Sequence, residues 1–357
     1  MDEDRPMGQV NLGEPVRRVT IPIVLGLTAL VIVCLGLLWQ GRKILGLSHA
    51  SGFHYPIEKT GQIPADRLEY REVALYRLPV GGAKALAIGS DDTVAVVCEK
   101  SLLLLEPDGS VRMQKPLEGS PSCVAIGGMA SLFPGRIYIG VGNEIWVLKP
   151  DGTEVSRWKV PGHYVHLTSL AVGSKELYAA DFGQWVVFRF NLEGELLGRI
   201  AEADENRGLA GLVIPSPYFD VACGVDGLVW VVNPGARRIE GYTPSGNLEL
   251  FWSKGGSAAL DDFFGCCNPA NIAILPSGHF VTAEKGLLRI KIYSPEGELA
   301  AVVAGPEQLD LPEIAAQRDQ FDHEHRAVDI AVDSRGRIWA LAVGTNMLQV
   351  FQKIENE

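Results

Sequence analysis

Two adjacent cysteines, Cys266 and Cys267, are the residues whose type and spacing most directly suggest chemistry in this chain. Neighbouring Cα atoms lie about 3.8 Å apart, whereas disulfide-bonded cysteines usually have Cα atoms roughly 4.4–6.8 Å apart. A disulfide between them would be strained and easily reduced, as a redox switch requires. As thiolates, the same side chains would bind a soft metal such as copper or zinc. The structural alternative is that one cysteine packs inward while the other fills a turn.

Two pairs of histidines could complete such a site. His323 and His325 form a His-x-His sequence. In an extended strand this spacing places both imidazoles on one side, as metal ligands often are. The alternative is a solvated loop of mixed charge. His163 and His166 are three positions apart and give a weaker signal.

Glu284 and Lys285 follow a strand-like segment downstream of the cysteine pair. Beside the thiols, Glu284 would serve as a metal ligand or general base, and Lys285 would contact an anion. The alternative is an exposed turn with a weak ion pair.

The elements that must position these residues form a repeat. Tight turns between apolar segments end in Gly109, Gly152, Gly194, Gly246 and Gly297. A repeat of about 40–50 residues built from short strands is typical of propeller blades. The alternation of apolar and polar residues beside the turns also predicts antiparallel strands.

Six segments place a small residue between apolar neighbours, as in Leu86-Ala87-Ile88 and Ile330-Ala331-Val332. Small side chains suit innermost strands around a channel, so the segments predict six blades. The last blade has only three strands, whereas residues 72–78 form a strand with no blade of its own. Pairing the two would close the ring without an open edge. We therefore predict an all-β fold, a six-bladed β-propeller over residues 69–357.

This topology predicts which loops share a face. Loops before innermost strands and loops between second and third strands lie at the same end of each blade. They contain His163, His166, Arg207, Tyr218, Cys266, Cys267, His323, His325, Glu99, Asp181, Asn233, Arg237, Arg238, Glu284 and Lys285. The predicted ligand-binding residues on this face are Cys266, Cys267, Glu284, Lys285, Arg237, Arg238, His163 and His166. The predicted metal ligands are Cys266, Cys267, His323 and His325.

Asp220, Asn271 and Asp329 each precede the small residue of an innermost strand by two positions. Here they would either bind a cation or water at the channel mouth or accept hydrogen bonds from backbone donors.

Residues 19–39 contain no charged side chain, and about 20 apolar residues of helix span a bilayer. They predict a single N-terminal transmembrane helix after a short tail (1–18) and before a linker (40–68). A signal peptide cleaved near Ala50 is the alternative. The Arg17-Arg18 pair favours a cytoplasmic N-terminus. We therefore expect a single-pass membrane protein with an extracytoplasmic propeller.

The formal net charge of −11 excludes one class of partner. An acidic domain repels phosphate backbones, so we expect no nucleic-acid binding. The sequence contains no CxxC, HExxH, nucleophile elbow or phosphate-binding glycine loop. These absences leave open whether the chain is an enzyme and favour a non-catalytic function.

The segment from Asn268 through Ala273 and Glu284 to the Arg289-Ile290-Lys291-Ile292-Tyr293 strand and Gly297 resembles an NHL repeat. A second good match contains residues 221–246, and the resemblance covers residues 72–354. NHL repeats form six-bladed propellers that mainly bind partners, while related propellers include lyases and hydrolases. The resemblance implies a binding module for a protein or small ligand. The alternative is a metal-binding or redox-active propeller in electron transfer or metal handling.

Overall fold

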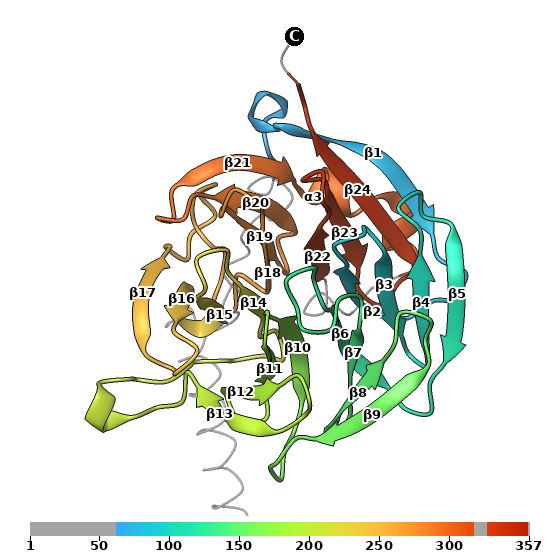
Figure 1. Ribbon diagram of the computed structural model, residues 1–357. Helices are drawn as coiled ribbons and strands as arrows, with labels where there is room; N and C mark the ends of the chain where they lie inside the picture. The colour runs from blue at the N-terminus through green and yellow to red at the C-terminus, as the bar shows by residue number, and fades with distance from the viewer. Residues whose placement is uncertain (1–61, 318–326, 356–357) are drawn as a thin grey trace, which may run out of the picture. The chain divides into compact units, whose positions relative to one another are not determined.

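The computed structural model describes residues 62–317 and 327–355, which are coloured in Figure 1. The predicted transmembrane segment at 19–39, the tail before it and most of the linker lie outside these residues. Within the described part, no helix has the length and apolar character needed to cross a membrane.

Six four-stranded antiparallel sheets surround a central channel in the described part of the chain (Figure 1). This confirms the predicted six-bladed β-propeller. Blades 1 to 3, each from the channel outward, are β2 (Ala83–Ile88), β3 (Val94–Cys98), β4 (Ser101–Leu105), β5 (Val111–Pro116); β6 (Pro121–Ile126), β7 (Ile137–Val141), β8 (Glu144–Leu148), β9 (Glu154–Lys159); and β10 (Leu167–Val172), β11 (Glu176–Asp181), β12 (Val186–Asn191), β13 (Leu196–Ile200). Blades 4 to 6 are β14 (Val221–Cys223), β15 (Val229–Asn233), β16 (Arg238–Tyr242), β17 (Leu248–Ser253); β18 (Asn271–Ile274), β19 (Phe280–Glu284), β20 (Arg289–Tyr293), β21 (Leu299–Ala304); and β22 (Val328–Val332), β23 (Ile338–Ala342), β24 (Met347–Lys353), β1 (Tyr70–Arg77).

The place of a strand in its blade decides its burial. The second and third strands are mostly buried because a neighbouring blade covers each side, and β3 and β4 are buried at every residue. Outermost strands such as β5 are largely exposed. Apolar clusters join neighbouring blades, including one in which Leu86 and Val94 of blade 1 contact Trp339 and Leu341 of blade 6.

The ring closes through strands from opposite ends of the described chain. β1 pairs antiparallel with β24, from Tyr70 opposite Lys353 to Arg77 opposite Met347. This pairing confirms the predicted closure. It also removes the sheet edge that an unpaired three-stranded blade would expose.

The glycines of the periodic turns have two functions. All five have a positive φ between 80° and 100°, a conformation that glycine adopts without strain. They also face the preceding blade. A Cβ atom at Gly194 or Gly297 would lie 2.4 Å from Trp158 or 2.7 Å from Trp252, respectively. The repeated glycines therefore allow two things: the tight turn itself and the close packing of one blade on the next.

Short helical segments lie in the connections. They are η1 (Ala65–Arg67), η2 (Glu205–Arg207), η3 (Pro234–Ala236), α3 (Pro306–Leu309) and α4 (Pro312–Ala315).

Candidate functional site

The loop before each innermost strand meets the turn between the second and third strands. In blade 5, the Lys285 amide donates a hydrogen bond to Asn268 Oδ1 at 2.8 Å. In blade 4, the Gly235 amide donates to the Val213 carbonyl at 2.8 Å. The two kinds of loop therefore lie together, as the topology predicted. We call the end of the ring that they form the thiol face, because residues 266–267 lie on it.

The last residue of the second strand fixes the preceding loop in blades 3, 4 and 5. Asp181, Asn233 and Glu284 occupy this position, and each is at most 2% exposed. Each side chain accepts a hydrogen bond from a backbone amide of the loop that enters its own blade, at 2.6, 2.9 and 2.7 Å. These three predicted face residues thus anchor loops from beneath the face.

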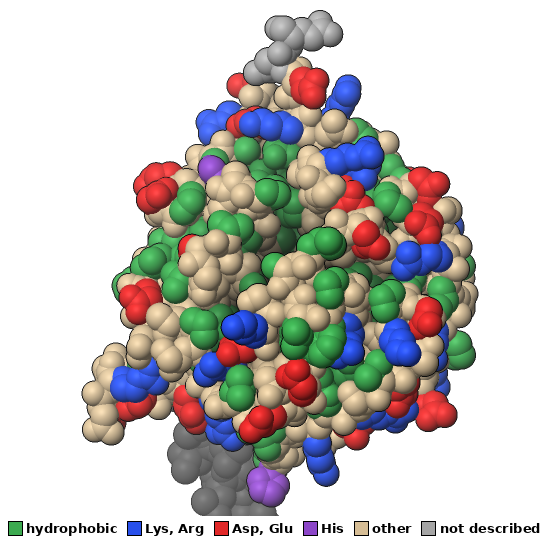
Figure 2. All heavy atoms as spheres, viewed as in Figure 1, with side chains coloured by type: hydrophobic (Ala, Val, Ile, Leu, Met, Phe, Trp, Pro, Cys, Tyr) green, Lys and Arg blue, Asp and Glu red, His purple; other side chains and the backbone are tan. Residues whose placement is uncertain are grey.

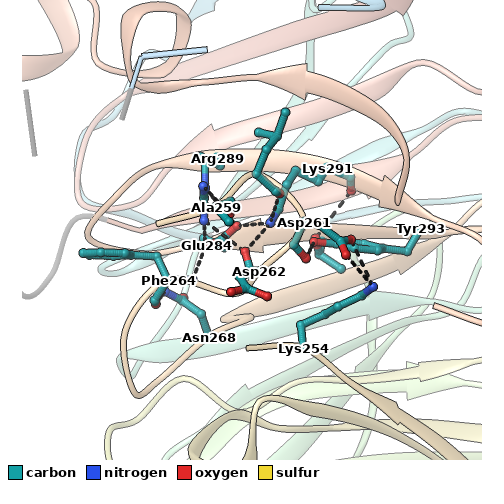
Figure 3. Close-up of polar contacts among 12 residues, drawn as sticks. Lys254, Ala259, Asp261, Asp262, Phe264, Asn268, Glu284, Arg289, Lys291 and Tyr293 are labelled. Carbon is teal, nitrogen blue, oxygen red and sulfur yellow. Dashed lines mark hydrogen bonds and ion pairs between the residues drawn. The ribbon is translucent and has the colours of Figure 1, made fainter. Parts of the chain in front are cut away.

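Glu284 belongs to a buried ion-pair network (Figure 3). Its carboxylate lies 2.7 Å from Lys291 Nζ and 2.8 Å from the Arg289 guanidinium, and the three side chains are at most 2% exposed. The interpretation of Glu284 as part of an exposed turn is therefore wrong, because its carboxylate compensates two buried cations. Burial lowers the pKa of Lys291 to about 8, while the Glu284 charge opposes this shift.

Every second side chain of β20 holds the loop between β17 and β18. Arg289, Lys291 and Tyr293 lie on the same side of the strand because side chains alternate. They donate hydrogen bonds of 2.7–3.2 Å to backbone carbonyls of residues 258–262 (Figure 3). The loop that leads to the cysteine pair is thus attached to the blade core along this stretch.

Beyond this attachment the loop exposes its tip at residues 265–267. The Asn268 side chain donates to the Phe264 carbonyl at 2.7 Å and so fixes the base of the tip. Cys266 is exposed and Cys267 is half-buried, and both are free thiols. Their Sγ atoms lie 3.2 Å apart. A firmly attached loop therefore presents two neighbouring thiols.

Residues from two blades form the surroundings of Cys267. Burial and the contact with Cys266 raise the pKa of the Cys267 thiol, whereas the Ser216 hydroxyl and the Lys285 charge oppose this rise. Lys285 Nζ lies 4.7 Å from the centre of the Tyr218 ring, and Tyr218 lines the central channel. Cys266, Cys267, Ser216, Tyr218 and Lys285 thus form a group beside the channel, which we call the thiol patch.

Arg237 and Arg238 are neighbours in one turn, but their side chains contact different parts of the protein. Arg238 lies 3.4 Å from Glu240 and 3.6 Å above the Phe251 ring of β17. Arg237 lies against the loop that carries the cysteines, because a Cβ atom at Gly256 would be 3.3 Å from its guanidinium. Arg237 thus approaches that loop, whereas the described contacts of the Arg238 side chain are with Glu240 and Phe251.

His163 and His166 do not belong to the thiol patch. His163 and His166 are exposed, and His166 contacts Phe182 edge to face at 5.6 Å. His323 and His325 lie outside the described residues. Within the described residues, no group of three or more His, Cys, Asp or Glu side chains is arranged to hold a metal. The copper or zinc site at Cys266, Cys267, His323 and His325 stays a prediction.

The innermost strands enclose a channel of about 290 Å³. Asp220 and Asp329 each accept a hydrogen bond from a backbone amide of the next blade, at 2.6 and 2.7 Å. Asn271 donates to a carbonyl of the next blade at 2.8 Å. Of the two interpretations of these residues, the contacts favour backbone hydrogen bonding.

Burial changes the ionisation of the groups in the channel. It raises the pKa of Asp220 to about 6. Burial and the nearby Asp220 charge raise the pKa of Asp329 to about 7. The Cys123 thiol lies near both carboxyl groups, and burial raises its pKa to about 12. The channel is therefore a region in which negative charge is disfavoured.

Arg289, Lys291 and Ser216 were not recognised as contributors to the site. A signal for the first two was present, because polar residues occupy alternate positions of an otherwise apolar third strand, Arg-Ile-Lys-Ile-Tyr. Charged residues on a strand that is buried on both sides require buried partners. Ser216 had no comparable signal, since only the path of its loop brings it to Cys267.

Comparison with solved structures supports the fold. A streptogramin B lyase has a TM-score of 0.55 and 13% identity, with 80% of this chain and 98% of that chain covered. A catalytically inactive histidine-to-alanine variant of virginiamycin B lyase from Staphylococcus aureus, solved with Quinupristin, has a TM-score of 0.53 and 16% identity, with 78% and 84% covered. No family model and no curated protein matches the sequence.

These likenesses define the chain as a six-bladed β-propeller. At such low identity they extend to the fold alone. Membership of the NHL-repeat family stays a prediction from the repeat sequences.

Proposed function

We propose that this propeller is a non-catalytic binding module that presents its thiol face to a protein or a small ligand. In this proposal, residues 19–39 hold it at a membrane with the propeller outside the cytoplasm. The observation that carries the proposal is a contrast within one loop. Buried hydrogen bonds from β19 and β20 fix residues 258–264, whereas Cys266 at the tip is exposed. A preordered tip loses little conformational entropy when it binds.

The thiol patch also has side chains suited to recognition. Tyr218 supplies an aromatic ring and Lys285 a cation beside the channel. Aromatic residues contribute strongly to binding interfaces, and the adjacent thiols add a polarisable surface.

Site-specific photocrosslinking in the native membrane tests the proposal. A benzophenone amino acid replaces Cys266 in one variant and Met129, which is 75% exposed on the opposite face, in the control. We expect a discrete adduct from position 266 alone. Equal adducts from both positions would contradict the proposed face. If neither position gives a protein adduct, the protein partner is rejected, and native mass spectrometry of wild type against Lys285→Gln tests for a small ligand.

A second function is favoured by the 3.2 Å separation of the two exposed-loop thiols. We infer as the alternative a metal-binding or redox-active site, in which His323 and His325 would add ligands for copper or zinc. Elemental analysis of wild type and of the Cys266→Ala/Cys267→Ala variant tests it, with Cys223→Ala as the control. Stoichiometric metal lost only from the double variant supports a metal site. A metal-free wild type whose two thiols are not reversibly oxidised would reject this function.

A further inference from the structure

A second cavity, of about 470 Å³, lies between blades 5 and 6 on the face opposite the thiol patch. The β18–β19 turn and the β22–β23 turn border it, together with the start of β1 and the end of β24. Figure 2 views the propeller from this face, where charged and hydrophobic side chains are interspersed. The cavity is separate from the central channel and from the proposed binding face.

Two cationic side chains and one histidine line this cavity. They are His279, Arg335 and Lys353, and no Asp or Glu is among the described residues of the lining. The whole chain has a formal charge of −11. A cavity with only basic charges is therefore a marked departure from the average composition.

Among the described residues, Arg335 and Lys353 lack the counter-ions that neighbouring basic residues have. Arg337, in the same turn as Arg335, pairs with Asp333 at 2.6 Å. In the part of the chain that the structure describes, neither Arg335 nor Lys353 forms an ion pair, although Arg335 donates its backbone amide to Asp333. Acidic groups border the lining from outside it. Asp92 accepts hydrogen bonds from the Ser334 amide and hydroxyl, both at 2.7 Å. The pKa of Glu296 is lowered mainly by the Ser294 hydroxyl and slightly by His279. A bound anion would relieve the repulsion among the basic groups.

Besides Ser277, Ser334 and Gly336, the remaining lining gives the cavity an apolar floor. It is formed by Tyr70, Leu275, Pro276, Ile292, Ala300 and Ala301. Tyr70 and Ile292 are 8% and 3% exposed, so the floor belongs to the packed blades. We propose that this cavity binds a small organic anion, with its carboxylate or phosphate at Arg335 and Lys353 and its apolar body on this floor. The volume lies within the range of about 300–1,000 Å³ typical of small-molecule sites.

Isothermal titration of the purified full-length protein tests the proposal with octanoate, octylamine and inorganic phosphate as probes. We expect saturable binding of octanoate, weaker binding of phosphate and none of octylamine. Because charge-assisted hydrogen bonds hold the anion, Arg335→Gln and Lys353→Gln should each weaken octanoate binding about tenfold. Lys149→Gln is the matched control, since Lys149 is exposed in a turn of the same face and outside the cavity.

Several results would overturn the assignment. They are octylamine binding as tightly as octanoate, unchanged affinity in both cavity variants, or an equal loss in the Lys149 control. Absence of saturable octanoate and phosphate binding at millimolar concentration would do the same. Phosphate binding as tightly as octanoate would reject the apolar part of the proposal. Because Arg335 and Lys353 are exposed, thermal unfolding should be unchanged in their variants, and any loss of binding then reports on the cavity.

Discussion

Glu284 and the two channel aspartates are carboxyl groups buried in the same ring by different means. Glu284 lies between two cations, Lys291 and Arg289, at 2.7 and 2.8 Å. Asp220 and Asp329 accept backbone hydrogen bonds at 2.6–2.9 Å. Neither aspartate forms an ion pair with any residue that the structure describes.

This difference shows that a buried carboxyl group can either fix a loop or connect neighbouring blades. In the Glu284 network, two buried cations compensate the buried carboxylate. These cations also donate hydrogen bonds to a backbone carbonyl of the loop that carries the cysteines. The channel aspartates connect successive blades, but their charges are uncompensated, so burial raises their pKa values to about 6 and 7. The thiol face therefore depends on ion pairing, whereas the channel contacts depend on pH.

The largest expected effect comes from removing the negative charge of Glu284 from its ion-pair network. Glu284→Gln leaves Arg289 and Lys291 without their carboxylate and should lower the free energy of unfolding by about 3–5 kcal/mol, as for a broken buried ion pair. Urea denaturation followed by tryptophan fluorescence measures it. Glu298→Gln, at an exposed position of the same blade, should change stability by less than about 0.5 kcal/mol. Similar losses in both variants would refute the buried network as a stabilising element.

The channel aspartates should make stability depend on pH. Their pKa values in the folded chain, about 6 and about 7, exceed the value of about 4 in an unfolded chain. The folded state therefore binds more protons between pH 4 and 7, and stability falls as the pH rises through this window. From pH 4.5 to 8, wild type should lose about 2–4 kcal/mol relative to Asp220→Asn/Asp329→Asn. A constant difference between the two proteins would show that these groups do not titrate as described.

A single channel substitution should have a smaller effect. At pH 5, Asp220→Asn replaces one of two accepting oxygens with a nitrogen that cannot accept a hydrogen bond. One backbone amide, of Val221 or Ile272, then loses its partner. The expected loss is about 1–2 kcal/mol in urea denaturation, against no change for Glu249→Gln, exposed in the same blade. A loss that grows from pH 5 to pH 8 would contradict the raised pKa values of the two aspartates, because removing the repulsion between Asp220 and Asp329 should reduce the cost at high pH.

The sequence predicted the frame of the molecule more fully than the roles of the polar residues. β20 begins and ends at Arg289 and Tyr293 as predicted. Of the strand predicted at residues 72–78, residues 72–77 lie in β1, which closes the ring. These predictions succeeded because strand alternation and glycine turns are local properties. The topology also predicted which loops lie together on the thiol face.

Roles within that face depend on contacts that the sequence does not encode locally. A polar residue at the end of a second strand either reaches solvent or turns beneath the incoming loop. For Asp181, Asn233 and Glu284 the path of the loop that enters the same blade decides this, and all three side chains turn beneath that loop. The predicted membrane helix lies outside the described residues and stays a prediction.

The smallest expected effect is on the rates at which the two thiols of the thiol patch are alkylated. Cys266 should react with iodoacetamide faster than Cys267, because Cys267 is half-buried and burial raises its pKa, and only the thiolate is reactive. Mass spectrometry of the labelled native protein measures both rates. Cys98 and Cys123, with pKa values raised by burial to about 11 and 12, serve as unreactive references.

Glu284→Gln should raise the Cys267 rate a few-fold, because loss of the bond to the Phe264 amide frees the loop and hydrates the thiol. Asp329→Asn, which removes a carboxyl group that accepts from the Leu86 and Ile330 amides of blades 1 and 6, should leave the rate unchanged. If both variants accelerate Cys267 equally, the reactivity reflects overall stability and the loop is not controlled by its anchor. If only Glu284→Gln does so, the buried ion pairs determine how the thiol face is presented.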